Sequence, residues 1–234
     1  MSNSEHTFSL GVIMLNTHFP RVLGDIGNPD SFDFDVVYQR VPSATVSAIV
    51  SANGVDPATK QDIFARLTQL EQQGIDLIVT TCGFLGEMQQ ELKAHTRTPV
   101  LTSSLLTIPF ARNFLSNADE QIGVLTFDAN KLNEKHFGGH FAADIVIGDI
   151  PKDGELYQTI QQDRPTLDTA KAEAEVVTAA QALVAAHPNI KVLILECTNL
   201  SPYRAALVKA LGLPTFDIIQ AIEWFKQSKV MANA

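Results

Sequence analysis

The chain contains only two cysteines, and both stand at positions suited to chemistry. Cys82 follows the apolar run IDLIV and two threonines, and Cys197 follows VLIL and a glutamate. Each therefore lies where a buried strand is expected to turn into a helix. At a helix N-terminus the dipole and the unpaired backbone N–H groups lower the pKa of a thiol, and the thiolate is its reactive form. We predict that both thiols are activated.

Two thiols on opposite sides of one carbon can invert a stereocentre. One thiolate removes a proton from one face, and the other thiol returns a proton to the opposite face. Neighbouring threonine hydroxyls and the backbone N–H groups after each cysteine would hold a substrate carboxylate. Two other interpretations stay open at this point. Each cysteine can be a small buried residue at a strand end, or the pair can act in redox sensing.

The elements that must position these thiols follow from the apolar pattern. Short apolar runs alternate with longer helical patterns, which is typical of an α/β protein with mostly parallel strands. Residues 56–74 and 166–187 carry apolar side chains at helical spacing, and each precedes a strand that ends near a cysteine. The predicted strands are residues 8–15, 34–40, 76–81, 99–102, 121–127, 143–148, 190–196 and 214–216.

The two halves of the chain resemble each other. LGVIMLNT at 10–17 matches IGVLTFDA at 122–129, and GIDLIVTTC at 74–82 matches NIKVLILEC at 189–197. The matching glycines lie 112 positions apart (123 minus 11) and the cysteines 115 (197 minus 82). Similar spacings close to half the chain length indicate an internal duplication rather than a short repeat.

The duplication predicts the domain organisation. We expect an α/β fold with two similar parallel-sheet α/β domains related by pseudo-twofold symmetry and the active site between them. The first domain would comprise residues 1–102 plus 210–234, and the second residues 103–209. Because ligands of parallel sheets gather at the carboxyl ends of the strands, both cysteines would face the crevice between the domains.

Composition excludes several function classes. The formal net charge is −9 and the pI about 5.0, and no cluster of Lys and Arg is present, so we expect no nucleic-acid partner. No stretch approaches the roughly 18 to 20 apolar residues of a membrane span, and no basic leader precedes the first apolar run. We therefore expect a cytoplasmic protein with free thiols. Neither cysteine lies in a CxxC motif or near a His pair, so we expect no metal.

Several motifs together resemble a known superfamily. GVIMLNT, TTCGF, PVLTSSLL, IGVLT and LECTN are similar, in this order, to the aspartate/glutamate/hydantoin racemases, which are cofactor-independent enzymes of two similar α/β domains. The resemblance implies a two-base mechanism without pyridoxal phosphate or another cofactor. It assigns Cys82 and Cys197 as the bases. It further implies a substrate pocket lined by Asn16, Thr81, Gly83, Thr126, Thr198 and Asn199.

The chain departs from the family pattern beside both cysteines. Amino-acid racemases have Asn-Thr after the first cysteine, where this chain has Gly83 and Phe84, and Gly before the second, where it has Glu196. Asn199 stands where an acidic residue or histidine is expected. Glu196 can replace a supporting acid, repel a second carboxylate or point into solvent. Arg21, in the loop after the first strand, can recognise an anion, although we favour a surface role.

The first functional hypothesis is a cofactor-independent racemase or epimerase acting on a small-molecule carboxylate such as aspartate or glutamate. Alternatives within the superfamily are a hydantoin racemase and a decarboxylase or cis-trans isomerase of a small diacid. The alternative from a different class is a two-lobed protein that binds a small ligand, with incidental cysteines. By analogy with other two-domain α/β enzymes, the protein can also pair as a homodimer.

Overall fold

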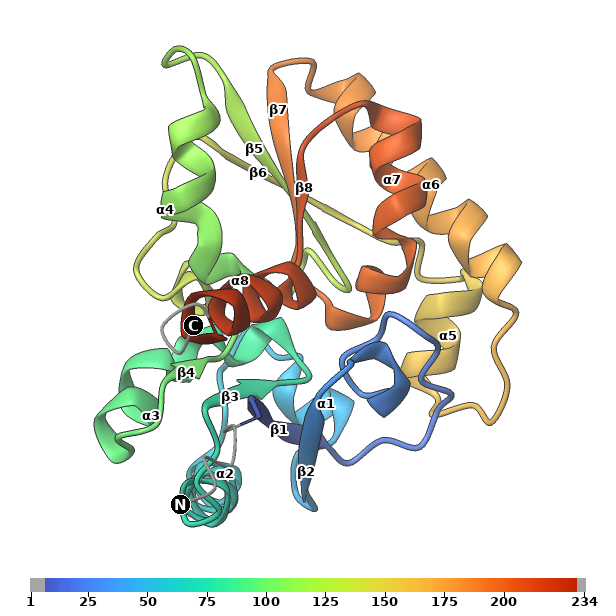
Figure 1. The fold of residues 1–234 in the computed structure, drawn as a ribbon. Coiled ribbons are helices and arrows are strands. Elements are labelled where there is room, and N and C mark those ends of the chain that lie inside the picture. The colour runs from blue at the N-terminus through green and yellow to red at the C-terminus, as the bar shows by residue number, and fades with distance from the viewer. Residues whose placement is uncertain (1–6, 231–234) are drawn as a thin grey trace.

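Two parallel four-stranded sheets organise the molecule (Figure 1). The structure is a computed structural model, and it describes residues 7–230. Within that range every predicted strand is present, with ends that differ from the prediction by no more than about two residues. The strands are β1 (Ser9–Leu15), β2 (Asp35–Val41), β3 (Leu77–Thr80), β4 (Val100–Leu101), β5 (Gln121–Thr126), β6 (Ile145–Asp149), β7 (Ile190–Leu195) and β8 (Thr215–Phe216).

Helices cover the sheets, and the two longest confirm the two predicted from helical spacing. Asp56 caps the N-terminus of α2 by accepting hydrogen bonds from the N–H groups of Ala58 and Thr59, and Asp168 caps α6 in the same way through Lys171. In the described part of the chain the helices are α1 (Val46–Ile49), α2 (Pro57–Glu71), α3 (Gln89–His95), α4 (Ile108–Ala111), α5 (Glu155–Gln161), α6 (Thr169–Ala186), α7 (Arg204–Leu211) and α8 (Ile218–Val230).

The two sheets repeat one topology. The first has the strand order β2-β1-β3-β4 and the second β6-β5-β7-β8, with parallel pairing throughout. A Cβ placed on Gly11 of β1 would lie 3.1 Å from Ile75 Cγ2, and one placed on Gly123 of β5 would lie 3.1 Å from Ile190 Cγ2. The same close packing therefore occurs in both halves, as the internal duplication predicts.

The C-terminal segment crosses from the second sheet to the first. The sequence boundary at residue 210 places β8 with the first domain, but the hydrogen bonds of β8 join it to β7 in the second sheet. The crossing comes at α8, which lies between the sheets in Figure 1. Ile218 and Ile222 of α8 are buried against Leu10 and Val12 of the first sheet. The predicted return of the chain to the first domain thus begins after β8.

The two halves meet over a buried contact. One continuous cluster of buried apolar residues extends from the first sheet into the second. Polar bonds also cross the contact: Ser104 Oγ donates to the Leu195 carbonyl at 2.6 Å, and Thr198 Oγ1 donates to the Thr81 carbonyl at 2.8 Å. The second bond ties the residue before Cys82 to the residue after Cys197, so it fixes the two cysteine turns relative to each other.

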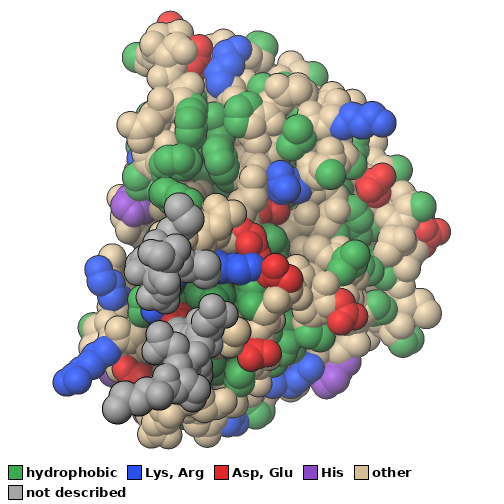
Figure 2. Space-filling model, viewed as in Figure 1, with side chains coloured by type: hydrophobic (Ala, Val, Ile, Leu, Met, Phe, Trp, Pro, Cys, Tyr) green, Lys and Arg blue, Asp and Glu red, His purple; other side chains and the backbone are tan. Residues whose placement is uncertain are grey.

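Exposed aromatic rings cluster on the surface beside α4 and α8. The ring of Phe110 on α4 lies 5.1 Å from that of Phe114 and 5.1 Å from that of Trp224 on α8, measured between ring centroids. Figure 2 shows hydrophobic side chains gathered over α4 on this face. The cluster joins α4 to α8 at the edge of the second sheet. Among the described residues, no helix has the length and apolar character needed to cross a membrane.

Candidate active site

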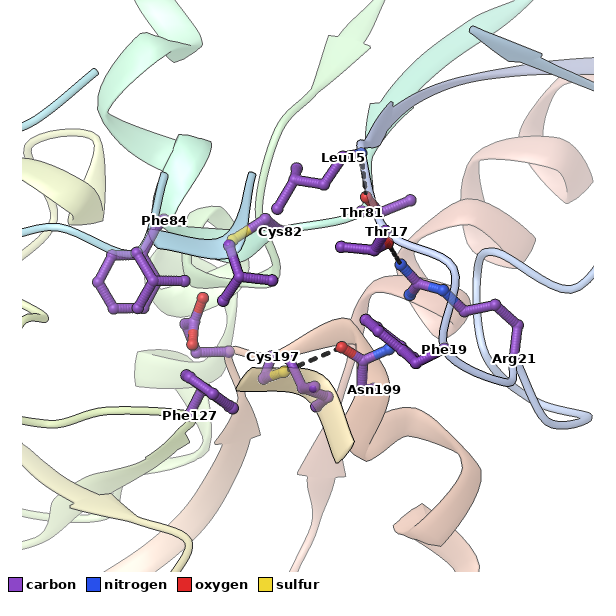
Figure 3. Close-up of a pocket in the computed structure, with 14 residues that line it drawn as sticks. Leu15, Thr17, Phe19, Arg21, Thr81, Cys82, Phe84, Phe127, Cys197 and Asn199 are labelled. Atoms are coloured by element: carbon purple, nitrogen blue, oxygen red, sulfur yellow. Dashed lines mark hydrogen bonds between the residues drawn. The ribbon is translucent and has the colours of Figure 1, made fainter. Parts of the chain in front are cut away.

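The two cysteines occupy equivalent places. Cys82 follows β3 and precedes the 3-10 turn η2 (Gly83–Met88), and Cys197 follows β7 and precedes the 3-10 turn η6 (Thr198–Tyr203). Each turn leads into an α-helix, so the expected helix starts with a tighter turn. Both side chains are 9% exposed and face the same pocket (Figure 3). The structure thus brings the thiols together between the two sheets.

The pocket is narrow and mostly apolar. Its volume is about 20 Å³, which is little more than the room that one water molecule needs. In Figure 3, Phe84 and Phe127 lie to one side of the cysteines, and Arg21 and Asn199 lie to the other. The pocket is lined by Leu15, Thr17, Phe19, Arg21, Val46, Val50, Thr81, Cys82, Phe84, Phe127, Ile160, Glu196, Cys197 and Asn199.

The protonation of the thiols differs from the sequence prediction. Burial raises the pKa of Cys82, and the carboxyl of Glu196 raises it further, whereas the backbone N–H of Phe84 and the charge of Arg21 act in the opposite direction. Burial, Glu196 and the other thiol likewise raise the pKa of Cys197. The prediction of lowered thiol pKa values is therefore wrong, because desolvation outweighs the favourable N–H groups.

Asn199 gives the Cys197 thiol a side-chain hydrogen-bond partner, and among the described residues Cys82 has no equivalent side-chain partner. The thiol of Cys197 donates to Asn199 Oδ1 at a sulfur–oxygen distance of 3.6 Å. Asn199 Nδ2 donates in turn to Asp25 Oδ2 at 2.5 Å, and this bond fixes which end of the amide faces the sulfur. Asp25 thus orients an acceptor toward the Cys197 thiol, and its charge acts to raise the pKa of that thiol, whereas the backbone N–H of Asn199 acts to lower it.

Glu196 lies in the pocket and not in solvent. It is 1% exposed, and Thr126 Oγ1 donates to its Oε2 at 2.6 Å. Burial raises the pKa of Glu196 to about 7, and the hydrogen bonds from Thr126 and from the backbone N–H groups of Phe127 and Phe84 offset only part of that effect. A Cβ at position 83 would come within 2.4 Å of Glu196 Oε1 and of its backbone oxygen. Only glycine therefore fits at Gly83 beside this carboxyl.

Arg21 belongs to a loop that closes the pocket from the first domain. Its Nη1 lies 3.2 Å from Asp25 Oδ1, its Nη2 donates to Thr17 Oγ1 at 2.9 Å, and its guanidinium lies 4.2 Å above the centre of the Phe19 ring. Asp163 of the second domain holds this loop by accepting hydrogen bonds from the N–H groups of His18 and Phe19 at 2.6 and 2.7 Å. The surface role favoured for Arg21 from sequence is wrong, because its side chain lines the pocket.

The residues implied by the family resemblance take different places. Thr81 and Asn199 line the pocket beside the cysteines. Gly83, Thr126 and Thr198 lie directly behind the lining, where they contact Glu196 or Thr81. Asn16 does not line the pocket, and its Nδ2 donates to the Pro42 carbonyl at 2.9 Å. Their roles in substrate binding stay predictions.

Sequence reasoning missed the aromatic part of the pocket. Phe19 stands two positions after the matching motif of the first half, Phe127 lies within that of the second half, and Phe84 follows the first cysteine by two positions, so their places near strand ends were the available signal. Apolar residues at such places are also usual in a core, which hides the signal. Within residues 7–230, no group of three or more His, Cys, Asp and Glu side chains is arranged to hold a metal ion.

Comparison with known proteins identifies the family. A family model described as Asp/Glu/Hydantoin racemase matches residues 32–224. The chain belongs to the Asp/Glu/hydantoin racemase family. Solved structures of this fold include allantoin racemase from Klebsiella pneumoniae, with a TM-score of 0.63, 12% identity and coverage of 97% of this chain and 89% of that one. A mutant of arylmalonate decarboxylase in its sulfate-associated form gives a TM-score of 0.62 at 15% identity, covering 97% and 94%.

Curated relatives of this racemase-family chain have a different named activity. A dimethylsulfoniopropionate lyase of Durusdinium sp. clade D is 29% identical over 232 residues, covering 95% of this chain and 75% of that protein. Dimethylsulfoniopropionate lyase 3 of Emiliania huxleyi (strain CCMP1516) is 33% identical over 225 residues, covering 90% and 57%. The chain thus spans three quarters of the first relative and little more than half of the second. The expectation of a racemase-superfamily enzyme is confirmed, whereas amino-acid racemisation is not.

Proposed function

We propose that this protein is a lyase that removes a proton from the carbon next to a small carboxylate and then expels a β-substituent. A β-sulfonio propionate such as dimethylsulfoniopropionate is the proposed substrate. The observation that carries the proposal is the pair of thiols that line one narrow pocket at equivalent strand ends. The curated relatives supply the reaction class, since two of them are lyases named for this substrate.

Cys82 is the proposed base. Arg21 acts to lower its pKa, and within residues 7–230 no side chain accepts a hydrogen bond from its thiol, whereas the Asn199 side chain accepts one from the Cys197 thiol. The Cys82 thiolate takes the α-proton, and the electron pair of that C–H bond forms a carbon–carbon double bond. The carbon–sulfur bond breaks at the same time, and its electrons leave with dimethyl sulfide. Acrylate is the second product, and the Cys82 thiol returns its proton to solvent.

The substrate itself would help to form the thiolate. Both thiols have raised pKa values because they are desolvated and lie near the Glu196 carboxyl. A sulfonium group in the same water-poor pocket introduces a positive charge, and a nearby opposite charge favours the ionised form of a thiol. A substrate that carries this charge therefore counteracts the burial and the Glu196 carboxyl that keep Cys82 protonated.

The direct test is the release of dimethyl sulfide. Purified protein incubated with dimethylsulfoniopropionate should produce dimethyl sulfide, measured by headspace gas chromatography, and an equal amount of acrylate. Cys82→Ser should lower kcat by about two to four orders of magnitude, because a hydroxyl is a far poorer base than a thiolate. Cys197→Ser should lower it less. Absence of dimethyl sulfide from the unchanged protein would reject the proposal.

Racemisation is the second candidate, and the equivalent placement of Cys197 favours it. A carbanion without a β-leaving group would be protonated by the Cys197 thiol on its other face, which gives inversion. In deuterated water the inverted product would carry deuterium at the α-carbon. Polarimetry on a panel of L- and D-amino acids and hydantoins tests this candidate. A racemase should lose turnover equally with either cysteine replaced, in contrast to the single-base lyase.

A further inference from the structure

The pocket carries charged groups of opposite sign on its two sides. Arg21 lies beside Asn199 on one side of the cysteines (Figure 3), and Glu196 contacts Gly83 and Thr126 on the strand ends. The two charges do not pair with each other. Arg21 is bound to Asp25, and Glu196 forms no salt bridge among the described residues. This pair of charges matches a ligand with one negative and one positive end, and the pocket of about 20 Å³ has to widen to admit such a ligand.

Glu196 has an unused oxygen. Thr126 donates to Oε2, and the backbone N–H groups of Phe127 and Phe84 lie near enough to the carboxyl to lower its pKa, but among the described residues Oε1 has no donor in full hydrogen-bonding geometry. A buried polar atom without a partner is costly, so such atoms in native proteins often await a ligand, an ion or a water. Because Glu196 lines the pocket, a bound molecule can reach this carboxyl. A positively charged group on that molecule would give the Glu196 carboxyl a partner.

Two phenylalanines complete the surroundings of this carboxyl. Phe84 and Phe127 line the pocket on the side away from Arg21. Each ring contacts another ring that does not line the pocket: Phe127 stacks on Tyr157 at 4.3 Å between centroids, and Phe84 and His136 form a T-shaped pair at 4.8 Å. Aromatic faces attract cations without strong hydration, such as quaternary ammonium groups. Sulfonium and ammonium methyl groups therefore suit this end of the pocket better than a primary amine does.

Arg21 is suited to bind the negatively charged end of such a ligand. Only two of its nitrogens bind Asp25 and Thr17, which leaves further N–H donors of the guanidinium for a ligand. Its planar fork matches a carboxylate, and the stacked Phe19 ring fixes its plane. The thiols of Cys82 and Cys197 lie between this end and the phenylalanines (Figure 3). A carboxylate bound to Arg21 would place its α-carbon next to them.

We infer that Glu196 is a specificity-determining residue that, together with Phe84 and Phe127, recognises an onium group on the substrate while Arg21 binds the carboxylate. The inference rests on the proposed function, for which it defines the substrate class. Substrates are zwitterions whose cationic group lies beyond the reacting carbon. A dianion such as succinate, with a second carboxylate in place of the onium group, is repelled by Glu196.

Binding of unreactive ligands tests this inference without turnover. The probes are β-alanine betaine, which carries a quaternary ammonium and a poor leaving group, its uncharged isostere with carbon in place of nitrogen, and succinate. Isothermal titration calorimetry at about pH 8 keeps Glu196 ionised. The unchanged protein should bind the betaine at least about tenfold more tightly than the isostere, because a desolvated ion pair and cation–π contacts are added.

Glu196→Gln is the decisive variant, since it keeps the shape of the side chain and removes its charge. It should bind betaine and isostere within about twofold of each other and should bind succinate more tightly than the unchanged protein does. Glu87→Gln is the matched control. Glu87 is a partly buried carboxylate at the contact between the domains that does not line the pocket, so its removal should leave the betaine preference intact.

The outcomes separate the two proposals. A betaine preference that survives in Glu196→Gln, with its fold verified by circular dichroism, overturns the role of Glu196 even if dimethyl sulfide is released. Equal binding of betaine and isostere by the unchanged protein overturns it as well. A preference that depends on Glu196 in a protein that releases no dimethyl sulfide supports onium recognition and rejects the lyase reaction.

Discussion

Glu196 is a buried carboxyl that acts on both thiols. Its carboxyl is enclosed, raises the pKa of Cys82 and of Cys197, and has a pKa of about 7 itself. Near neutral pH the pocket therefore contains a carboxyl that is close to half ionised. Its ionisation attracts a cationic ligand and disfavours a thiolate, so ligand charge and thiol reactivity are coupled through one side chain.

The raised pKa of Glu196 predicts a pH-dependent effect on stability. Folding favours the protonated form, so this contribution is fully present below the ordinary pKa of 4.5 and is lost as the pH rises through about 7. Relative to the unchanged protein, Glu196→Gln should thus gain up to about 3 kcal/mol between about pH 5 and pH 8. Urea unfolding at both pH values measures the difference. An equal difference in unfolding free energy between Glu196→Gln and the unchanged protein at the two pH values would show that the pKa of Glu196 is not raised.

At the residue scale, sequence identified the thiols but not the charges around them. Cys82 and Cys197 stand out because they are the only cysteines and occupy matching motifs. Glu196 and Arg21 belong to residue types that are exposed in most proteins, so the sequence favours a surface role for Arg21. Their burial depends on how the two domains approach each other, and no local pattern encodes that approach.

At the scale of elements, the strands were predictable and the turns after the cysteines were not. Each strand is a short apolar run bounded by polar or turn residues, and this signal is local. The helices after Cys82 and Cys197 begin instead as 3-10 turns. In η6 the turn contains Pro202, and in η2 Gly83 lies against the backbone of Glu196. The contact of Gly83 with Glu196 joins the two domains, and sequence spacing does not reveal such a contact.

The loop after β1 is the element that closes the pocket, and Asp163 holds it. Asp163 has a φ of 51°, a left-handed conformation that Asp tolerates better than most residues. Burial acts to raise its pKa, but the hydrogen bonds from His18 and Phe19 outweigh this effect and lower it. One carboxylate oxygen thus accepts two backbone N–H groups of the loop that carries Phe19 and Arg21.

Replacing Asp163 should loosen this loop. Asp163→Ala leaves both N–H groups without their acceptor, which costs about 1 to 3 kcal/mol and should raise KM for dimethylsulfoniopropionate by roughly tenfold or more. Asp163→Asn is the matched control, because its amide oxygen accepts the same two bonds and only the pair with the exposed His18 is lost. Initial-rate kinetics measure both. A similar KM for the Ala and Asn variants would contradict a role for these hydrogen bonds.

At the scale of the whole molecule, duplication explains why one site has two equivalent thiols. Each half supplies a sheet of the same strand order, and each sheet ends in a cysteine turn. The bond from Thr198 to the Thr81 carbonyl joins the two turns directly. The surroundings are unequal, since the first half contributes Arg21 and Asp25 and the second contributes Glu196 and Asn199. Equivalent backbones thus carry different chemistry on the two sides of the pocket.

The narrow pocket predicts that both thiols react slowly with added reagents. Both cysteines are 9% exposed and have raised pKa values, so few thiolates are present and reagents reach them slowly. At about pH 8, iodoacetamide should alkylate the unchanged protein at least about tenfold more slowly than an exposed thiol. Mass spectrometry follows the alkylation. Alkylation should abolish the proposed release of dimethyl sulfide, and bound β-alanine betaine should slow the alkylation.

We expect the rate of alkylation to be limited by opening of the two halves. Variants that change this opening or the thiol pKa values should therefore change the rate. Asp163→Ala should react faster than Asp163→Asn, since it frees the loop over both thiols. Glu196→Gln should also react faster at about pH 8, because the carboxylate that disfavours the thiolates is gone. Cys197→Ser leaves Cys82 alone and reports its rate separately. Rapid alkylation of both thiols in the unchanged protein would mean that the pocket is open in solution, and the narrow site would then not control access.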